Sequence, residues 1–155
     1  MTLSVTVPAL PVRDVGAAVQ HYATRFGFES PHQDDGFAVL VRDEARVHLW
    51  RADDDGWRQR SLEDLRECPV QSGAETFLAG TASCRIAVDR VELVDGLYAE
   101  LAAAGVLHPA DTGAPRDTDF GTREFATLDL DGNLLEFYGW RGSQGTRGEE
   151  TLLTS

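Results

Sequence analysis

An internal repeat constrains the fold of this chain more than any other feature of the sequence. Apolar residues recur at helical spacing from Asp14 to Gly27 and again from Asp89 to Gly105. Asp14 is placed as an N-cap, Asp89 and Glu92 resemble a capping box, and each segment stops at a glycine. The pattern therefore predicts two helices, one in each half of the chain.

Short alternating segments predict strands on both sides of each helix. The expected strands span residues 3–7, 37–42 and 46–50 in the first half, and 84–88, 123–129 and 134–138 in the second half. Turns at 43–44 and 131–133 join the later strands of each half with residues typical of hairpins. The halves match element by element, which predicts an α+β fold.

Length and composition favour one domain over residues 1–140. The chain has 155 residues, of which 42% are apolar, and this is enough for one packed core. We divide the domain into module one (1–50), a connector (51–80) and module two (81–140). The connector is long and polar, with a helical turn expected around 61–67, and it either links the modules or passes over a ligand site. The tail, 141–155, is rich in small polar residues and is expected to be flexible.

Charge and hydropathy exclude several classes of partner. All 14 basic residues are arginines, against 26 acidic residues, and the net charge is −12. Such a charge repels nucleic acid and favours cationic ligands. Acidity also increases solubility, which is an alternative reason for it. No apolar run approaches the roughly 20 residues that cross a membrane. Cys68 and Cys84 lack metal-binding spacing and are expected to be free thiols. We expect a cytoplasmic protein with neither a nucleic-acid nor a membrane partner.

Motifs in both halves resemble one family. Arg13-Asp14-Val15 leads into a helix that contains His21-Tyr22 and ends with Arg25-Phe26-Gly27-Phe28, and the late segments Phe120–Phe125 and Asp129–Phe137 follow. Over about residues 3 to 139 the chain resembles the vicinal oxygen chelate superfamily. That superfamily contains glyoxalase I, extradiol dioxygenases, fosfomycin-modifying enzymes and the non-catalytic bleomycin-resistance proteins. The resemblance implies two βαβββ modules whose curved sheets enclose a cup.

The resemblance also identifies the positions that would hold a metal. In the enzymes of that superfamily, each module supplies one ligand from its first strand and one from its last strand, and the matching positions here are Val7, His48, Ser83 and Glu136. Only His48 and Glu136 are usual ligands, whereas catalytic metal sites need at least three. We therefore expect no metal, no cofactor and no catalysis. The alternative is a metal-dependent glyoxalase-, dioxygenase- or thiol-transferase-like enzyme that uses His48 and Glu136.

Strand alternation suggests a second role for these two residues. It places His48 and Trp50 on one strand face, and Glu136 and Tyr138 on another. In the implied cup these side chains could bind a ligand directly. An equally weighted alternative is that His48 and Glu136 satisfy each other or Arg123. The sequence carries no G-x-S-x-G, phosphate-loop or H-E-x-x-H pattern, so a binding function leads.

Local features are similar to the bleomycin-resistance proteins. Val7-Pro8-Ala9-Leu10 resembles the arm of those proteins, in which proline is a hinge and the first strand is exchanged, and this implies a strand-swapped homodimer. The segment 34–38 resembles their acidic and aromatic segment, where Phe37 would stack on the planar bithiazole of the drug. Phe120 stands where that family often has tryptophan and could form the opposite wall.

The leading interpretation is a protein that sequesters a bleomycin-type glycopeptide or another bulky, aromatic, cationic antibiotic. The expected ligand-binding residues are Phe37, His48, Trp50, Phe120, Glu136, Tyr138, Asp34, Asp35 and Arg123. Strand aromatics more often belong to a core, and acidic turns are usually only solvated. Arg85 replaces an aromatic of the resistance proteins and would repel a cationic drug, so an enediyne or a quinone compound stays open. A third alternative is an accessory protein without a small-molecule role.

Overall fold

The computed structural model describes residues 2–52, 61–67 and 73–142. Module one contains β1 (Ala9–Val12), α1 (Val15–His21), the π-helical turn η1 (Tyr22–Phe26), β2 (Glu29–Gln33), β3 (Phe37–Arg42) and β4 (Ala45–Arg51). The connector contains α2 (Leu62–Glu67), as expected. Module two contains β5 (Ser83–Ala87), the 3-10 turn η3 (Val91–Leu93), α3 (Val94–Ala104), β6 (Arg116–Asp117), β7 (Thr122–Leu128) and β8 (Leu134–Trp140). The tail expected to be flexible lies outside the described residues beyond 142.

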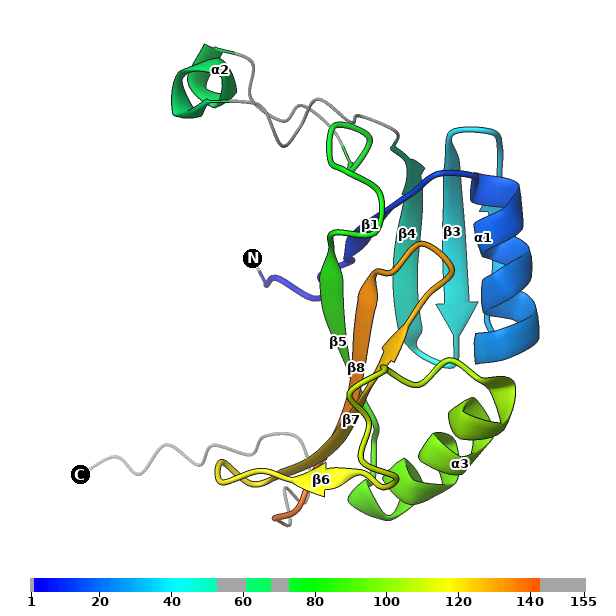
Figure 1. Cartoon of the computed structure of the whole chain (residues 1–155), viewed down its shortest axis with the longest axis vertical. Coiled ribbons are helices and arrows are strands. Elements are labelled where there is room, and N and C mark those ends of the chain that lie inside the picture. Colours follow the sequence, from blue (N-terminus) through cyan, green and yellow to red (C-terminus); the bar gives the residue numbers. More distant parts are fainter. Residues whose placement is uncertain (1, 53–60, 68–72, 143–155) are drawn as a thin grey trace.

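The strands form two sheets with the same topology. The strand orders are β1-β4-β3-β2 and β5-β8-β7-β6, and in each sheet the first strand runs parallel to the last one of its module. The remaining neighbours are antiparallel. The prediction of an α+β fold built from two βαβββ modules is confirmed (Figure 1).

The helix ends follow the sequence signals only in part. Asp14 caps α1 by accepting a hydrogen bond from the Ala17 N–H at 2.8 Å, and Gly27 ends η1 in the left-handed conformation with φ 69°. Gly105 likewise ends α3. The capping box expected at Asp89 and Glu92 is wrong, because η3 begins without a side-chain cap. This turn packs on β8, where glycine at position 139 allows the close approach, so tertiary packing positions the start of the helix.

The first strand lies later than predicted. Residues 3–7 form no strand, and Leu3 and Val5 are 94% and 71% exposed. Pairing with β4 instead begins where the His48 N–H donates to the Pro8 carbonyl at 2.9 Å, and β1 follows from Ala9. Alternation alone does not make a strand, since each strand also needs a neighbour to accept and donate its backbone hydrogen bonds. In this chain β1 takes the place beside β4.

The edge strands β2 and β6 were not placed by the sequence pattern. Both are polar and mostly exposed, so they show no apolar alternation. They lie at the outer edges of their sheets, where charged residues are common because one side of the strand faces water. Their positions follow from pairing with β3 and β7.

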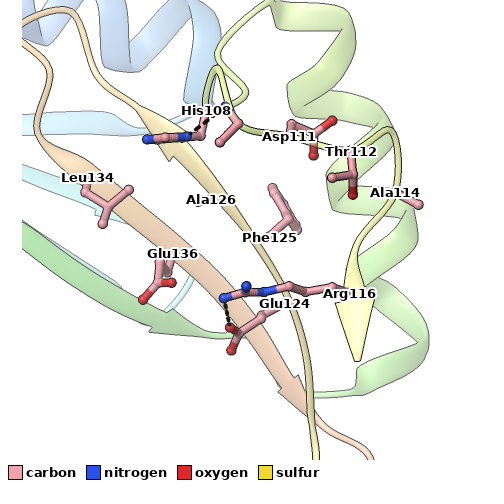
Figure 2. Close-up of a pocket in the computed structure, with 11 residues that line it drawn as sticks. His108, Asp111, Thr112, Ala114, Arg116, Glu124, Phe125, Ala126, Leu134 and Glu136 are labelled. Carbon is pink, nitrogen blue, oxygen red and sulfur yellow. Dashed lines mark hydrogen bonds and ion pairs between the residues drawn. The ribbon is translucent and has the colours of Figure 1, made fainter. Parts of the chain in front are cut away.

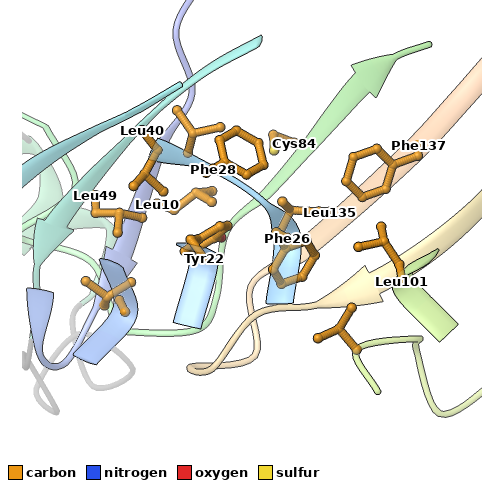
Figure 3. Packing of buried hydrophobic residues seen from close by; sticks show 14 of the residues in the cluster. Leu10, Tyr22, Phe26, Phe28, Leu40, Leu49, Cys84, Leu101, Leu135 and Phe137 are labelled. Atoms are coloured by element: carbon orange, nitrogen blue, oxygen red, sulfur yellow. The ribbon is translucent and has the colours of Figure 1, made fainter. Parts of the chain in front are cut away.

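One hydrophobic core serves both modules. Leu10, Leu49, Leu101 and Leu135, which come from β1, β4, α3 and β8, are all fully buried in one cluster. Figure 3 shows Tyr22 and Phe26 of η1 close to this cluster, beside residues of module two such as Leu135. In Figure 1, α1 and α3 cover the same side of the molecule, so each sheet has a second face that no helix of the described residues covers. We call these the open faces.

The late Asp-x-Asp-Gly-Asn segment is a joint between the modules. Asp129 accepts hydrogen bonds from the backbone N–H groups of residues 131–133 and, through Oδ2, from the Tyr22 hydroxyl at 2.9 Å. Asn133 donates to the Pro11 carbonyl and accepts from the Ala82 N–H. Burial and then the nearby Asp129 raise the pKa of Tyr22 well above its usual value. The motif that carried the resemblance therefore holds the two halves together.

Candidate ligand-binding site

The open face of module one carries an aromatic cluster. The ring of Phe37 lies 4.7 Å from that of Trp50 and 5.0 Å from that of His48, the latter nearly edge-on. His32 of β2 adds a fourth ring at 5.9 Å from Phe37. Val47 and Leu49 point to the other face and are buried, so the predicted alternation of β4 is confirmed. The half-buried rings leave flat apolar surface accessible to a ligand.

The acidic turn before β3 positions Phe37. Asp34 Oδ1 accepts hydrogen bonds from the N–H groups of Gly36 and Phe37 at 2.8 and 2.9 Å, and these bonds close the hairpin. The bond from Gly36 is the main cause that lowers the pKa of Asp34. Asp35 is exposed in the same turn. The turn therefore keeps carboxylates at the edge of the aromatic cluster.

The end of the connector reaches Trp50. Gly73 lies so close to the indole that any side chain at this position would overlap the ring. Residues 73–80 then return to module one, where the Gly80 N–H donates to the Pro11 carbonyl at 3.1 Å. This end of the connector does reach the predicted site. The rest of the excursion, including Asp53, Asp54 and Asp55, lies outside the described residues apart from α2.

The open face of module two is ionic. Arg85 of β5 donates to Glu124 of β7 at 2.6 Å, lies 3.3 Å from Glu136 of β8, and covers the ring of Tyr138 at 4.4 Å from its centroid. Arg116 of β6 pairs with the other oxygen of Glu124 at 3.0 Å. The side chain of Glu124 is 5% exposed, so this carboxylate is buried among its cations.

A cavity of about 320 Å³ opens beside this network (Figure 2). The loop before β6, with His108 and Asp111, forms one wall, and Arg116, Glu124 and Glu136 line the sheet side. Apolar atoms of Phe125, Ala126 and Leu134 complete the lining. The cavity can therefore accommodate a ring with both apolar contacts and hydrogen bonds.

The proposed partners of His48 and Glu136 are corrected by the structure. The two residues belong to different sheets and form no pair with each other, and Glu136 pairs with Arg85 instead. Arg123 faces the helix side of β7, where Asp95 of α3 and Asp117 of β6 bind its guanidinium. Strand alternation explains this, because Arg123 is one residue out of phase with Glu124, which faces Tyr138.

Phe120 and Tyr138 do not belong to the aromatic cluster of module one. Phe120 is 62% exposed in the turn between β6 and β7, whereas Tyr138 lies under Arg85 and 6.3 Å from the ring of Trp140. The structure thus brings the predicted residues together as an aromatic group on module one and an ionic group on module two. Sequence reasoning missed Arg116 and Glu124, although the pairing of β7 with β8 places Glu124 opposite Tyr138.

Two features bear on metal and membrane binding. Within 2–52, 61–67 and 73–142, no three His, Cys, Asp or Glu side chains gather as a metal-binding group. Of the two positions without a usual ligand, Val7 is 38% exposed ahead of β1, and Ser83 is exposed at the start of β5. Among the same residues, no helix is long and apolar enough to cross a membrane.

Comparison with known proteins agrees with this architecture. A bleomycin resistance protein of Geobacillus stearothermophilus is 45% identical over 133 residues, which cover 86% of this chain and 94% of that protein. A bleomycin resistance determinant encoded on the transposon Tn5, known from a crystal structure, is 19% identical in sequence to this chain. The match covers 90% of this chain and 100% of that protein, with a TM-score of 0.63.

A third similar protein was solved with a ligand. The bleomycin-binding protein from bleomycin-producing Streptomyces verticillus, complexed with copper(II)-bleomycin, is 27% identical with a TM-score of 0.59, and covers 88% of this chain and 96% of its own. The sequence profile of one family matches residues 4–137 of this chain. The chain belongs to the Glyoxalase/Bleomycin resistance protein/Dioxygenase superfamily.

Proposed function

We propose that this protein binds a bleomycin-type antibiotic in the cytoplasm and sequesters it without chemical change. The observation that carries the proposal is the 45% identity to a bleomycin resistance protein over 86% of this chain. The aromatic cluster of module one supports it, because a flat heteroaromatic ring can stack on Phe37 and Trp50. The exposed carboxylates of Asp34 and Asp35 lie near the same rings and favour a cationic tail.

The proposed site is completed by a second copy of the chain. The two open faces lie on the same side of one chain, and the aromatic and ionic groups form separate clusters there. A homodimer would bring module one of one copy against module two of the other. The apolar and exposed residues Leu3, Val5 and Val7 support an exchange of the first segment, because they would be buried on a partner sheet.

Sedimentation equilibrium tests the dimer. The whole chain should have twice the mass of one chain at micromolar concentration, and deletion of residues 2–7 should weaken the association. A single-chain mass for the whole protein across this range would contradict the dimer. An unchanged association constant after the deletion would contradict only the exchange of the first segment.

Titration with metal-free and copper-loaded bleomycin tests the function. Calorimetry should give saturable binding, and mass spectrometry should recover the drug with its mass unchanged. Elemental analysis separates the enzyme alternative, since one tightly held metal per chain that is lost on substitution of His48 or Glu136 would support that alternative. No heat with either form of the drug would overturn the proposal.

Fluorescence locates the bound drug on one of the two faces. Trp50 belongs to the aromatic cluster, whereas Trp140 is 51% exposed at the end of β8. We expect Trp50→Phe to remove most of the change that bleomycin causes, and the matched Trp140→Phe to retain it. The reverse result would place the drug away from module one.

A further inference from the structure

Arg85 is a cation at the centre of the module two open face. Its guanidinium contacts Glu124 and Glu136 and lies over Tyr138, and its side chain is 43% exposed. The equivalent place in module one is held by Ala9, because Ala9 pairs with His48 as Arg85 pairs with Glu136. The arginine is therefore a feature of one module and not a requirement of the fold.

The carboxylates around the cavity all have partners: Glu124 and Glu136 pair with arginines, and Asp111, which also lines the cavity, accepts hydrogen bonds from the Tyr98 hydroxyl and the Gly113 N–H. Arg85 and Arg116 face two carboxylates, and Glu124 uses one oxygen for each arginine while Thr122 donates a third bond. The side chain of Glu124 is only 5% exposed, so its carboxylate is not available to hydrogen-bond a ligand. Glu136 is 27% exposed and lines the cavity, so it can still accept a hydrogen bond.

We propose that Arg85 determines which part of the antibiotic enters the cavity of module two. It neutralises Glu136, so the cavity takes an uncharged, hydrogen-bonding part of the ligand and the cationic tail is directed elsewhere. This inference rests on the proposed antibiotic-binding function and extends it to the orientation of the ligand.

The cost of moving charge out of water supports this division. A cationic tail that enters the cavity loses hydration. It meets Glu124 and Glu136, which already have arginine partners, and Asp111, which already accepts two hydrogen bonds. An uncharged ring that carries N–H groups loses less hydration, and it gains apolar contact with Phe125, Ala126 and Leu134 and an acceptor in Glu136. Arg85 thus makes the cavity favour an uncharged group over a cation, and it does so through its pairing with Glu136.

Two ligands that differ in tail charge test the proposal. The probes are bleomycin with its cationic tail and the same drug with the tail hydrolysed to the free acid. Calorimetry on the whole protein gives the ratio of the Kd of the tail-free drug to that of the tailed drug. Arg85→Gln should raise this ratio by about tenfold at low salt, because one unpaired carboxylate then attracts the tail. The increase should shrink in 0.5 M salt, because the Debye length falls to about 4 Å and screens the attraction between the tail and the carboxylate.

Matched variants separate charge from shape. Arg85→Lys keeps the cation and should keep the ratio of the native chain. Arg90→Gln removes the same charge from an exposed position beyond β5 and should also leave the ratio unchanged. If Arg85→Gln does not fold, Arg116→Gln makes the same charge change at a 72% exposed side chain of the same network and should raise the ratio.

Each outcome decides one of the two proposals. A folded Arg85→Gln variant with an unchanged ratio would overturn the role of Arg85, as would equal weakening of both probes, which indicates only a change of shape. Failure of the native chain to bind either probe would overturn the antibiotic-binding function itself and would be visible before any variant is made.

Discussion

The two open faces have the same backbone and different chemistry. On module one, His48 lies beside the small Ala9 and contacts the ring of Phe37. On module two, Glu136 lies beside Arg85 and is drawn into an ionic network. The faces thus differ at several matched strand positions, because Glu124 pairs with Tyr138 on module two, whereas Phe37 pairs with Trp50 on module one.

The difference between the two open faces shows that the repeat keeps the backbone and the core side chains, and leaves the open-face side chains free to differ. Backbone pairing sets where each residue lies, and both modules keep the same strand order and the same alternation. Side chains on the core faces remain apolar because the shared core requires it, whereas side chains on the open faces have no such constraint. The open faces are therefore free to take different parts of one ligand.

The largest effect is expected from the buried carboxylate of module two. Glu124→Leu should lower the free energy of unfolding by about 3 kcal/mol, because the buried hydroxyl of Thr122 and two arginines lose a charged hydrogen-bond acceptor. Urea denaturation measures this loss. His48→Leu on the aromatic face is the matched control and should cost clearly less, and equal losses would remove the contrast between the faces.

The next effect is on binding at module one. Phe37→Ala should raise the Kd for bleomycin by about 30-fold, or about 2 kcal/mol, as expected when a central aromatic contact is removed. Val39→Ala is a matched control, since Val39 is half-buried on the same strand and pairs with His48. Equal changes in the two variants would show that Phe37 has no special role.

A smaller effect concerns the core behind the ionic face. Burial raises the pKa of the Cys84 thiol to about 11, from 9. The folded state therefore favours the protonated thiol, and its contribution to stability is complete below pH 9 and is lost as the pH rises toward 11. At pH 10 the loss is about 1.4 kcal/mol.

The variant Cys84→Ala isolates this contribution. Between pH 7 and pH 10 its free energy of unfolding should fall by about 1.4 kcal/mol less than that of the native chain. Denaturation curves at the two pH values provide the comparison. The same pH dependence in both proteins would show that the thiol does not titrate on unfolding.

The smallest effect is expected at the acidic turn. Asp34→Ala should weaken bleomycin binding roughly threefold, because the turn loses the acceptor that orders Phe37. Asp34→Asn keeps the acceptor and should lose less. Calorimetry at pH 7 suits the test, since the backbone hydrogen bond from Gly36 lowers the pKa of Asp34 from its ordinary value and the native carboxylate is ionised at that pH. An equal loss for the two variants would indicate that the charge of Asp34 matters more than the geometry of the turn.

Sequence patterns recovered the parts of the fold that are set by local rules. Helix periodicity, the Asp14 cap and the glycine stops located both helices, and alternation located the hairpin β3–β4 and its counterpart β7–β8. The first strand was placed too early, because an alternating segment does not reveal whether a neighbouring strand is present. The polar edge strands β2 and β6 were missed for the related reason that pairing alone defines them.

The site shows the same division. Alternation correctly grouped His48 with Trp50 and Glu136 with Tyr138, since that grouping depends only on strand geometry. The partner of Glu136 could not be read from alternation, because Arg85 and Glu124 are brought to it by pairing of β5, β8 and β7. Arg123 was misplaced because it is one residue out of phase with Glu124 along β7, so its side chain points to the opposite face and meets Asp95 of α3.

The sequence by itself determined the repeat and the apolar faces, because these depend on spacing along the chain, and its motifs carried the resemblance to the family. Only the tertiary structure decided how the polar residues are used. It made Asp129 and Asn133 a joint between modules, Arg123 a link to α3, and Arg85 the centre of an ionic face. A polar side chain can take any nearby partner, and the partner is chosen by residues that are distant in sequence and adjacent only after folding.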